Sequence, residues 1–189
     1  MKGVVFNLLE EAVTRAFGPD SWDDLVESSG VHGSYTSLGN YPDSEVEALV
    51  EAAMRALSMD RDQVLRWFGQ NAMPVLSELY PAFFDGPSSA REFTAGVNTI
   101  IHAEVRKLYP DSACPHFRLR DATDGGLVMD YLSVRNMCAL AQGFVEGAAA
   151  HYGEQVDFQH IACTARGDPH CTFEIVWDAA ADDGRARAA

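Results

Sequence analysis

The first two thirds of the chain carry apolar residues at the spacing of amphipathic helices. Between residues 4 and 17, one helical face collects Val5, Leu8, Leu9, Ala12, Val13 and Ala16. Comparable patterns predict further helices over residues 20–28, over 43–56 with Asp43 as the N-cap, over 59–68 and over 73–84. This part of the chain is therefore predicted to be helical.

A longer helix is predicted at the end of this helical part. Ser89 and Glu92 stand three residues apart, as in a capping box, and the helical pattern continues to Tyr109, where Pro110 ends it. His102 lies on the apolar face of this helix. The sequence therefore predicts one continuous helix that carries a histidine into an apolar environment.

Beyond Pro110, apolar residues recur at every second position, which is typical of strands. Strands are predicted over residues 116–121, 126–132, 155–164 and 170–177. Residues 136–152, between the second and third strands, form an amphipathic helix that can cover a sheet. The predicted fold class is α+β, in which an N-terminal helical subdomain and the long helix pack on a C-terminal four-stranded antiparallel sheet with a covering helix.

Composition narrows the kinds of molecule that this chain can bind. Its 189 residues are 47% hydrophobic, which is enough for one domain with a sizeable core. The 28 acidic and 14 basic residues give a net charge of −14 without any block of Lys or Arg, which argues against nucleic acid.

We expect this domain to span residues 1–178. The remaining residues, 179–189, are expected to form a disordered tail because they lack large apolar side chains.

The chain shows no pattern that predicts export or membrane insertion. Its N-terminal apolar run is short, is broken by Glu10 and Glu11, and is followed by no small-residue cleavage site. It also has no run of about 18 consecutive apolar residues. We therefore expect a soluble, cytoplasmic protein with no membrane partner.

His102 is the first candidate for binding chemistry. From its helix alone, a buried neutral histidine that bonds a backbone carbonyl explains the pattern better than a metal or haem ligand does. The stretch YLSVR changes that balance, because Tyr131, Ser133 and Arg135 stand at alternate positions. In an extended chain these three side chains, called here the polar clamp, project to the same side.

The polar clamp suits a ligand with carboxylates. An arginine can pair with a carboxylate through two hydrogen bonds, and two hydroxyls can each donate one more. Protohaem offers two neighbouring propionates and a large apolar body, so the clamp can hold the propionates while His102 approaches the iron. An ordinary polar strand, with Arg135 paired to a surface acid, is the other interpretation.

Several motifs, in their order and spacing, resemble the bacterial H-NOX family of haem nitric oxide/oxygen binding domains, which is related to the sensor domain of soluble guanylate cyclase. The matching stretches are the MKG opening, IIHAEVRKLYPDSACP, YLSVR followed by a helix, and GDPHCTFEI. The resemblance implies haem b, with His102 as the proximal iron ligand and the polar clamp on the propionates. It also implies that Pro115 and Val5 press the haem out of planarity.

The resemblance bears on the choice of gas through one position. In family members that hold oxygen, a tyrosine nine residues after the Tyr131 position donates a hydrogen bond to the gas, and Leu140 stands there in this chain. Oxygen on ferrous haem gains from a buried donor, whereas nitric oxide binds tightly without one. Leu140 therefore favours nitric oxide, with carbon monoxide as a second candidate, unless Asn71 or Tyr80 supplies the donor.

The resemblance also implies how gas binding becomes a signal. Nitric oxide weakens the bond trans to it, so the bond between iron and His102 breaks or lengthens, the haem relaxes, and the helical subdomain shifts against the sheet. We expect no enzymatic activity, and the signal then passes to a separate protein, in this family commonly a histidine kinase or a cyclic-diguanylate enzyme. The alternative is a haem-free module for an apolar ligand or a protein partner, with a zinc-stabilised C-terminal half.

The cysteines point to a second site. Two residues separate His160 from Cys163, a following turn can bring Cys171 back beside them, and Cys138 lies on the covering helix. Three thiolates and one imidazole make a tetrahedral zinc set, and some bacterial H-NOX proteins carry a site of this composition. The chain has no export signal, so a reducing compartment with free thiols is expected.

Other interpretations of this second site stay open. Three structural cysteines with a surface histidine would produce the same sequence pattern. His170, which is adjacent to Cys171, can replace His160 as the nitrogen ligand. Cys114 is expected to be a packing thiol beside Pro115.

Overall fold

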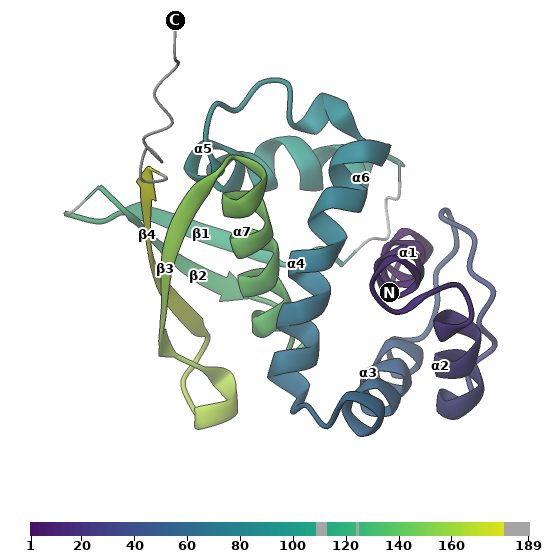
Figure 1. The fold of residues 1–189 in the computed structure, drawn as a ribbon. Helices are drawn as coiled ribbons and strands as arrows, with labels where there is room; N and C mark the ends of the chain where they lie inside the picture. Colours follow the sequence, from purple (N-terminus) through teal and green to yellow (C-terminus); the bar gives the residue numbers. More distant parts are fainter. Residues whose placement is uncertain (109–112, 124, 180–189) are drawn as a thin grey trace, which may run out of the picture.

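The computed structural model describes residues 1–108, 113–123 and 125–179 (Figure 1). The helices are α1 Gly3–Phe17, α2 Ser21–Ser29, α3 Asp43–Leu57, α4 Arg61–Leu79, α5 Ala90–Gly96, α6 His102–Leu108 and α7 Cys138–His151. The strands are β1 His116–Asp121, β2 Leu127–Leu132, β3 Glu154–Ala162 and β4 Cys171–Ala179. The predicted helix end at Tyr109 and Pro110, and the part of the predicted tail from residue 180 onward, lie outside the described residues.

The four strands form one antiparallel sheet in the order β1-β2-β4-β3. Its inner face buries the alternate apolar residues Met129, Tyr131, Phe173 and Ile175. These side chains pack with α7, which covers that face of the sheet (Figure 1). The predicted α+β class, the sheet and its covering helix are therefore confirmed.

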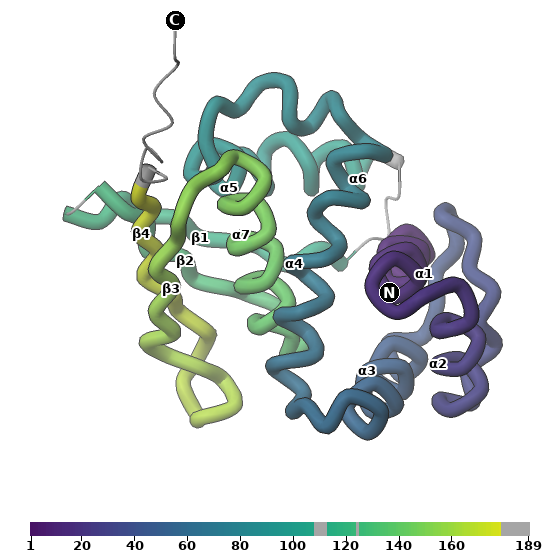
Figure 2. Tube along the Cα trace, viewed as in Figure 1, coloured from purple at the N-terminus to yellow at the C-terminus, as the bar shows by residue number. Residues whose placement is uncertain are grey.

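Helix α7 also packs closely against α4, because glycines let the two backbones approach. A Cβ atom added at Gly143 would lie 2.1 Å from the carbonyl oxygen of Arg66, and one added at Gly69 would lie 2.5 Å from that of Leu140. Helices α1–α3 lie on the other side of α4, away from the sheet (Figure 2). The molecule is thus layered as sheet, α7, α4 and N-terminal helices.

The N-terminal helices have their own apolar core. Phe6, Leu49 and Leu65 are each at most 1% exposed in it. Between α1 and α4 this core is continuous with side chains of α7 such as Leu140 and Phe144. The helical part and the sheet part are therefore joined through α4 and α7.

One correction concerns α4. Residues 59–68 and 73–84, predicted as two helices, contribute to a single helix that continues through Pro74 and ends at Leu79. A proline inside a helix removes one backbone hydrogen bond, but apolar side chains are buried on both sides of Pro74 and offset that loss. Tertiary packing, which the local pattern does not contain, therefore decides the length of this helix.

The predicted role of Asp43 as an N-cap is wrong. Pro42 occupies the N-cap position of α3, and the structure shows no side-chain cap bond there. Asp43 is the first residue of the helix, and its carboxylate accepts a hydrogen bond from Arg135 at 2.7 Å. The Asp43 carboxylate thus forms a long-range ion pair with Arg135 and does not cap the helix, as the local pattern predicted it would.

The sheet extends further than predicted at its C-terminal end. Ala179, expected to begin the disordered tail, is the last residue of β4 and pairs with Glu154 of β3. Strand pairing joins backbone groups, so it does not require the apolar side chains that this segment lacks.

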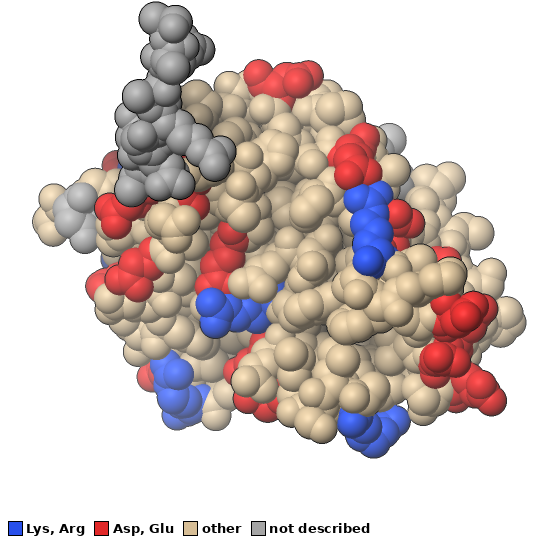
Figure 3. Space-filling model, viewed as in Figure 1, with Lys and Arg blue, Asp and Glu red and all other residues tan. Residues whose placement is uncertain are grey.

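Acidic side chains gather over α2 on the face shown in Figure 3, in keeping with the net negative charge. The described residues contain no helix that is both long enough and apolar enough to cross a membrane.

Candidate functional site

A cavity of about 370 Å³ lies where the N-terminal helices, the segment carrying His102, the sheet and α7 meet. Its volume falls within the range of about 300–1,000 Å³ that is typical of small-molecule and cofactor sites. Much of its wall is apolar, including Leu8, Met73, Phe93, Val97, Phe117 and Phe144. A second apolar cavity, of about 390 Å³, lies among α1–α4 and contains none of the predicted site residues.

The helix that carries His102 runs without a break from Ala90 to Leu108, as predicted, but it is not α-helical throughout. Ser89 accepts a hydrogen bond from the backbone N–H of Glu92, and α5 follows. The Glu92 carboxylate, however, bonds Ser88 and not the N-cap residue, so the predicted capping box is only half formed. Residues Val97–Ile101 are then π-helical, and α6 begins at His102.

His102 lies in the cavity wall, and its Nδ1 atom is buried with no hydrogen-bond partner among the described residues. Burial lowers the pKa of the imidazole to about 4, and the electrostatic effects of Arg106 and His116 act in the same direction, while the Pro115 backbone opposes them. The neutral imidazole that results at neutral pH is the form that binds a metal.

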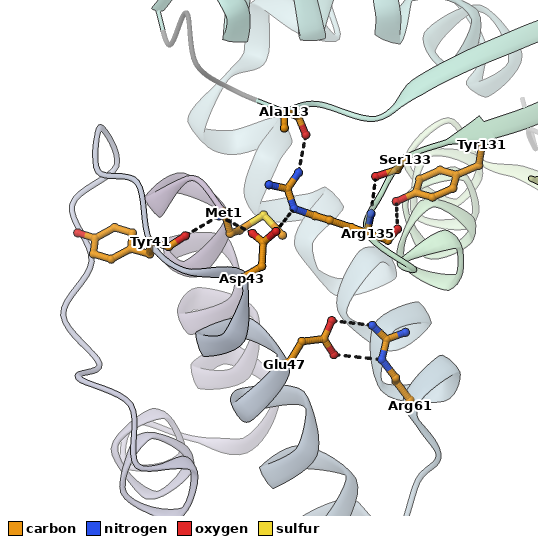
Figure 4. Close-up of polar contacts among 9 residues, drawn as sticks. All are labelled: Met1, Tyr41, Asp43, Glu47, Arg61, Ala113, Tyr131, Ser133 and Arg135. Carbon is orange, nitrogen blue, oxygen red and sulfur yellow. Dashed lines mark hydrogen bonds and ion pairs between the residues drawn. The ribbon is translucent and has the colours of Figure 1, made fainter. Parts of the chain in front are cut away.

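The polar clamp does not continue the strand as predicted, because β2 ends at Leu132 and the chain then bends. Its three side chains nevertheless line the cavity. The Tyr131 hydroxyl donates to the Arg135 carbonyl oxygen at 3.1 Å, and the Arg135 backbone N–H donates to Ser133 Oγ at 3.1 Å (Figure 4). These internal bonds hold the clamp in a compact bend.

The Arg135 guanidinium links the clamp to the N-terminal helices (Figure 4). Its Nε atom donates to Asp43 Oδ2 at 2.7 Å, and its Nη1 atom donates to the Ala113 carbonyl oxygen at 2.5 Å. Burial by itself raises the pKa of Asp43, but the hydrogen bonds from Arg135 and the Met1 ammonium lower it overall. The alternative interpretation anticipated an acidic partner for Arg135, and Asp43 is that partner.

The remaining predicted residues also reach the cavity. Pro115, Val5 and Leu140 line it, on three separate segments of the chain. Cys114, expected to be a packing thiol beside Pro115, is half-buried and lines the cavity next to that proline. Sequence reasoning missed this position and that of Asp43, because both depend on how distant segments meet.

The two alternative donors are placed differently. Asn71 is not among the lining residues, and its amide donates to the Trp67 carbonyl oxygen at 2.8 Å, within the same helix. Tyr80, at the end of α4, does line the cavity. Of these two side chains, Tyr80 is therefore the one that can meet a ligand there.

The structure brings the predicted zinc ligands together. One ligand atom from each of Cys138, His160, Cys163 and Cys171 lies within 4.8 Å of the others. His160 Nε2 is buried without a hydrogen-bond partner in the described part of the chain. His170 is directed elsewhere, with its Nε2 atom 3.4 Å from Asp130 Oδ1. The cluster therefore has the composition and compactness of a tetrahedral metal site.

Comparison with known families matches this arrangement. A family model described as "Haem-NO-binding" matches residues 2–160, a stretch that includes all the predicted cavity residues. The chain belongs to the haem-NO-binding family. Domains of this family, also called H-NOX domains, bind haem, take gaseous ligands such as NO, CO and O2, and signal to partner proteins. They are sensor domains that are not themselves catalytic.

Relatives of this H-NOX chain include sensors within larger enzymes. Soluble guanylate cyclase gcy-32 of Caenorhabditis elegans is 24% identical over 164 residues, which make up 79% of this chain and 23% of the relative. The chain thus spans about a quarter of the length of the guanylate cyclases that it matches.

Solved structures of H-NOX proteins share the whole fold. The Fe(II)NO form of an H-NOX protein from S. oneidensis is 29% identical, with a TM-score of 0.87 over 94% of this chain and 99% of that chain. The unliganded Fe(II) form of one from K. algicida is 26% identical, with a TM-score of 0.78 over 94% of this chain and 97% of that chain. The fold is therefore that of a haem-based gas sensor.

Proposed function

We propose that residues 1–178 form a nitric oxide sensor in which His102 binds the haem iron. The observation that carries the proposal is that predicted residues from five separate segments line one cavity of cofactor size. These residues are Val5, His102, Pro115, Tyr131, Ser133, Arg135 and Leu140. Convergence of this kind is not expected if each residue had only its local structural role.

The side chains of the cavity fit haem b. His102 offers a buried neutral imidazole whose Nδ1 atom has no hydrogen-bond partner among the described residues, and an imidazole of this kind can bind a metal. The clamp adds a guanidinium and two hydroxyls to a wall that is largely apolar, and these groups suit the propionates. When bound, haem supplies a ferrous iron that takes a diatomic gas. Asp43 holds the Arg135 guanidinium in place through its ion pair.

Nitric oxide is the proposed gas because Leu140 offers no hydrogen-bond donor where oxygen-holding members carry a tyrosine. Asn71 does not line the cavity, and its amide donates to the Trp67 carbonyl oxygen of its own helix, which argues against it as the donor. Tyr80→Phe tests the other, and we expect the gas preference to stay unchanged. Carbon monoxide is the second candidate ligand.

Release of His102 is the proposed signal. Weakening of its bond to iron would free the segment carrying it to move relative to the clamp and to Pro115 and Val5, which are proposed to press on the haem. Such a movement signals only if a partner binds the two states with different affinity. The proposed partner is a separate histidine kinase or cyclic-diguanylate enzyme.

A zinc ion is proposed for the cluster of Cys138, His160, Cys163 and Cys171. Burial raises the pKa of the Cys138 thiol, so this cysteine ionises readily only if a cation compensates the charge. Zinc would tie α7 to β3 and β4, next to the clamp. Elemental analysis of purified protein should find about one equivalent, and Cys163→Ser should reduce it; a metal-free preparation that is fully folded would overturn this site.

Visible spectroscopy tests the central proposal. Ferrous protein expressed with ample haem should show a Soret band, should change with nitric oxide to the spectrum of a five-coordinate iron, and should form no stable complex in air. A colourless protein would instead support a haem-free module for another apolar ligand. A stable oxygen complex in air would overturn the choice of nitric oxide while keeping haem.

A further inference from the structure

The helix segment that carries His102 is irregular immediately before this residue. Val97–Ile101 are π-helical, and the His102 backbone N–H donates to the Val97 carbonyl oxygen, five residues earlier. In an α-helix this N–H would bond the carbonyl of Asn98. That carbonyl instead accepts a hydrogen bond from the Arg106 guanidinium at 3.1 Å.

The Asn98 side chain ties this segment to the sheet. Its Nδ2 atom donates to the Phe117 carbonyl oxygen at 2.5 Å, and its Oδ1 atom accepts from the Phe117 backbone N–H at 3.2 Å. Phe117 belongs to β1, an edge strand, where alternate residues direct both backbone groups away from the sheet. The side-chain amide of Asn98 therefore bonds both backbone groups of Phe117 at the free edge of the sheet, as a neighbouring strand would.

Phe117 connects this tie to the cavity. Its ring stacks on the His102 imidazole with centroids 5.6 Å apart and planes at 23°, and it also contacts the Tyr131 ring at 5.9 Å. Phe117 lines the cavity, whereas Asn98 does not. A change at Asn98 can therefore reach His102 and the clamp without altering the cavity wall itself.

We propose that Asn98 is a positioning residue that sets the direction in which His102 faces the cavity. It does so by bonding both backbone groups of Phe117 and so holding Val97–Ile101 in the π form. A return to α-helical bonding would shift the register by one residue, which is about 100° of rotation around the helix. The inference rests on the proposed role of His102 as the iron ligand.

Hydrogen exchange tests the tie in the haem-free protein. Asn98→Ala should lower the protection of the Phe117 amide by about tenfold or more, as expected for the loss of a hydrogen bond. Thr99→Ala is the matched control, because Thr99 is an exposed residue of the same π segment whose hydroxyl bonds only within its helix, to Gly96. Equal protection of Phe117 in Asn98→Ala and wild type would overturn the tie.

Resonance Raman spectroscopy of the ferrous haem protein tests the positioning. The iron–histidine stretching band should shift or broaden in Asn98→Ala and stay unchanged in Thr99→Ala. An unchanged band in Asn98→Ala would overturn the inference. If the wild type lacks this band altogether, the proposed role of His102 fails instead, and the exchange experiment still reports on the tie.

A second variant covers the case in which Asn98→Ala does not fold. Asn98→Asp keeps an oxygen that accepts from the Phe117 N–H but cannot donate to its carbonyl. It should keep the protection of the Phe117 amide and still alter the iron–histidine band. Wild-type behaviour in both measurements would contradict the proposal.

Discussion

Two features set His102 apart from an ordinary core histidine: its burial, and a ring nitrogen with no hydrogen-bond partner in the described part of the chain. An unsatisfied buried polar atom costs free energy, and the low pKa keeps the ring neutral down to acidic pH. The sequence pattern placed this residue on an apolar helix face, but it favoured a bond to a backbone carbonyl. The missing partner could be seen only once the surrounding segments were in place.

His102→Gly should abolish haem retention. The truncation removes the proposed iron ligand and leaves space in the wall that free imidazole can fill, so added imidazole should restore the Soret band. The exposed His32 provides the control, since His32→Gly should retain haem without imidazole. Full haem retention in His102→Gly would remove this residue from the site.

Leu140→Tyr should favour oxygen. The new hydroxyl would enter the cavity wall and could donate a hydrogen bond to a bound gas, so we expect a stable oxygen complex. Oxygen should dissociate from Leu140→Tyr at least about tenfold more slowly than from Leu140→Phe, because one hydrogen bond of about 1.4 kcal/mol has that effect. Leu140→Phe adds a ring of similar size without the donor and should not slow dissociation. Equal rates in the two variants would mean that the hydroxyl is not responsible.

At the scale of elements, close backbone packing between α4 and α7 connects the helical part to the sheet. Local periodicity predicted α7 but divided α4 into two helices, with Gly69 between them. It could not show that Gly69 and Gly143 mark a helix contact, because a glycine is locally only an unfavourable helix residue. The same limit applies to the π segment, which depends on a bond between Asn98 and a strand that follows it in the sequence.

Gly143→Ala should destabilise the protein by about 1–3 kcal/mol, because the new methyl group would lie 2.1 Å from the Arg66 carbonyl oxygen and force the helices apart. Urea unfolding of the haem-free protein measures this. Gly86→Ala is the control, since nothing lies within 4 Å of a Cβ atom added there. Similar midpoints for the two variants would contradict the close contact.

At the scale of the whole molecule, two arginines connect the segment after β2 to α3, and Figure 4 shows their ion pairs with α3. Arg135 pairs with Asp43, and Arg61 pairs with Glu47 at 2.7 Å while also donating to the Asn136 carbonyl oxygen at 2.5 Å. Asp43 and Glu47 lie one helical turn apart on the same helix. The clamp and the N-terminal helices are therefore linked by ion pairs as well as by the apolar core.

The link through Asp43 should depend on pH. Since its pKa is lowered in the folded protein, its contribution is fully present above the ordinary value of 3.8 and is lost as the pH falls through the lowered pKa. Asp43→Asn should reduce the free energy of unfolding at pH 7 by up to about 1 kcal/mol, as for a half-exposed pair, with less difference from wild type below pH 3.

Urea unfolding at both pH values measures this dependence on Asp43. Asp85→Asn, at an exposed position, is the control and should differ little from wild type at either pH. A deficit in Asp43→Asn that stays constant from neutral to acidic pH would show that the carboxylate does not act through its charge.

The sequence by itself determined the α+β class, the elements of the sheet and the chemical types present: an imidazole on an apolar helix face, a hydroxyl and guanidinium clamp, and a set of three cysteines with one histidine. These follow from local periodicity and from motifs a few residues long. The family resemblance also implied that Val5, Pro115 and Leu140 lie at the haem, but only the tertiary structure decided that they line one cavity with His102. It also decided that Arg135 pairs with Asp43 and that the helix before His102 is π-helical. Each of these depends on contacts between segments far apart in the chain, whose free energy no local pattern records.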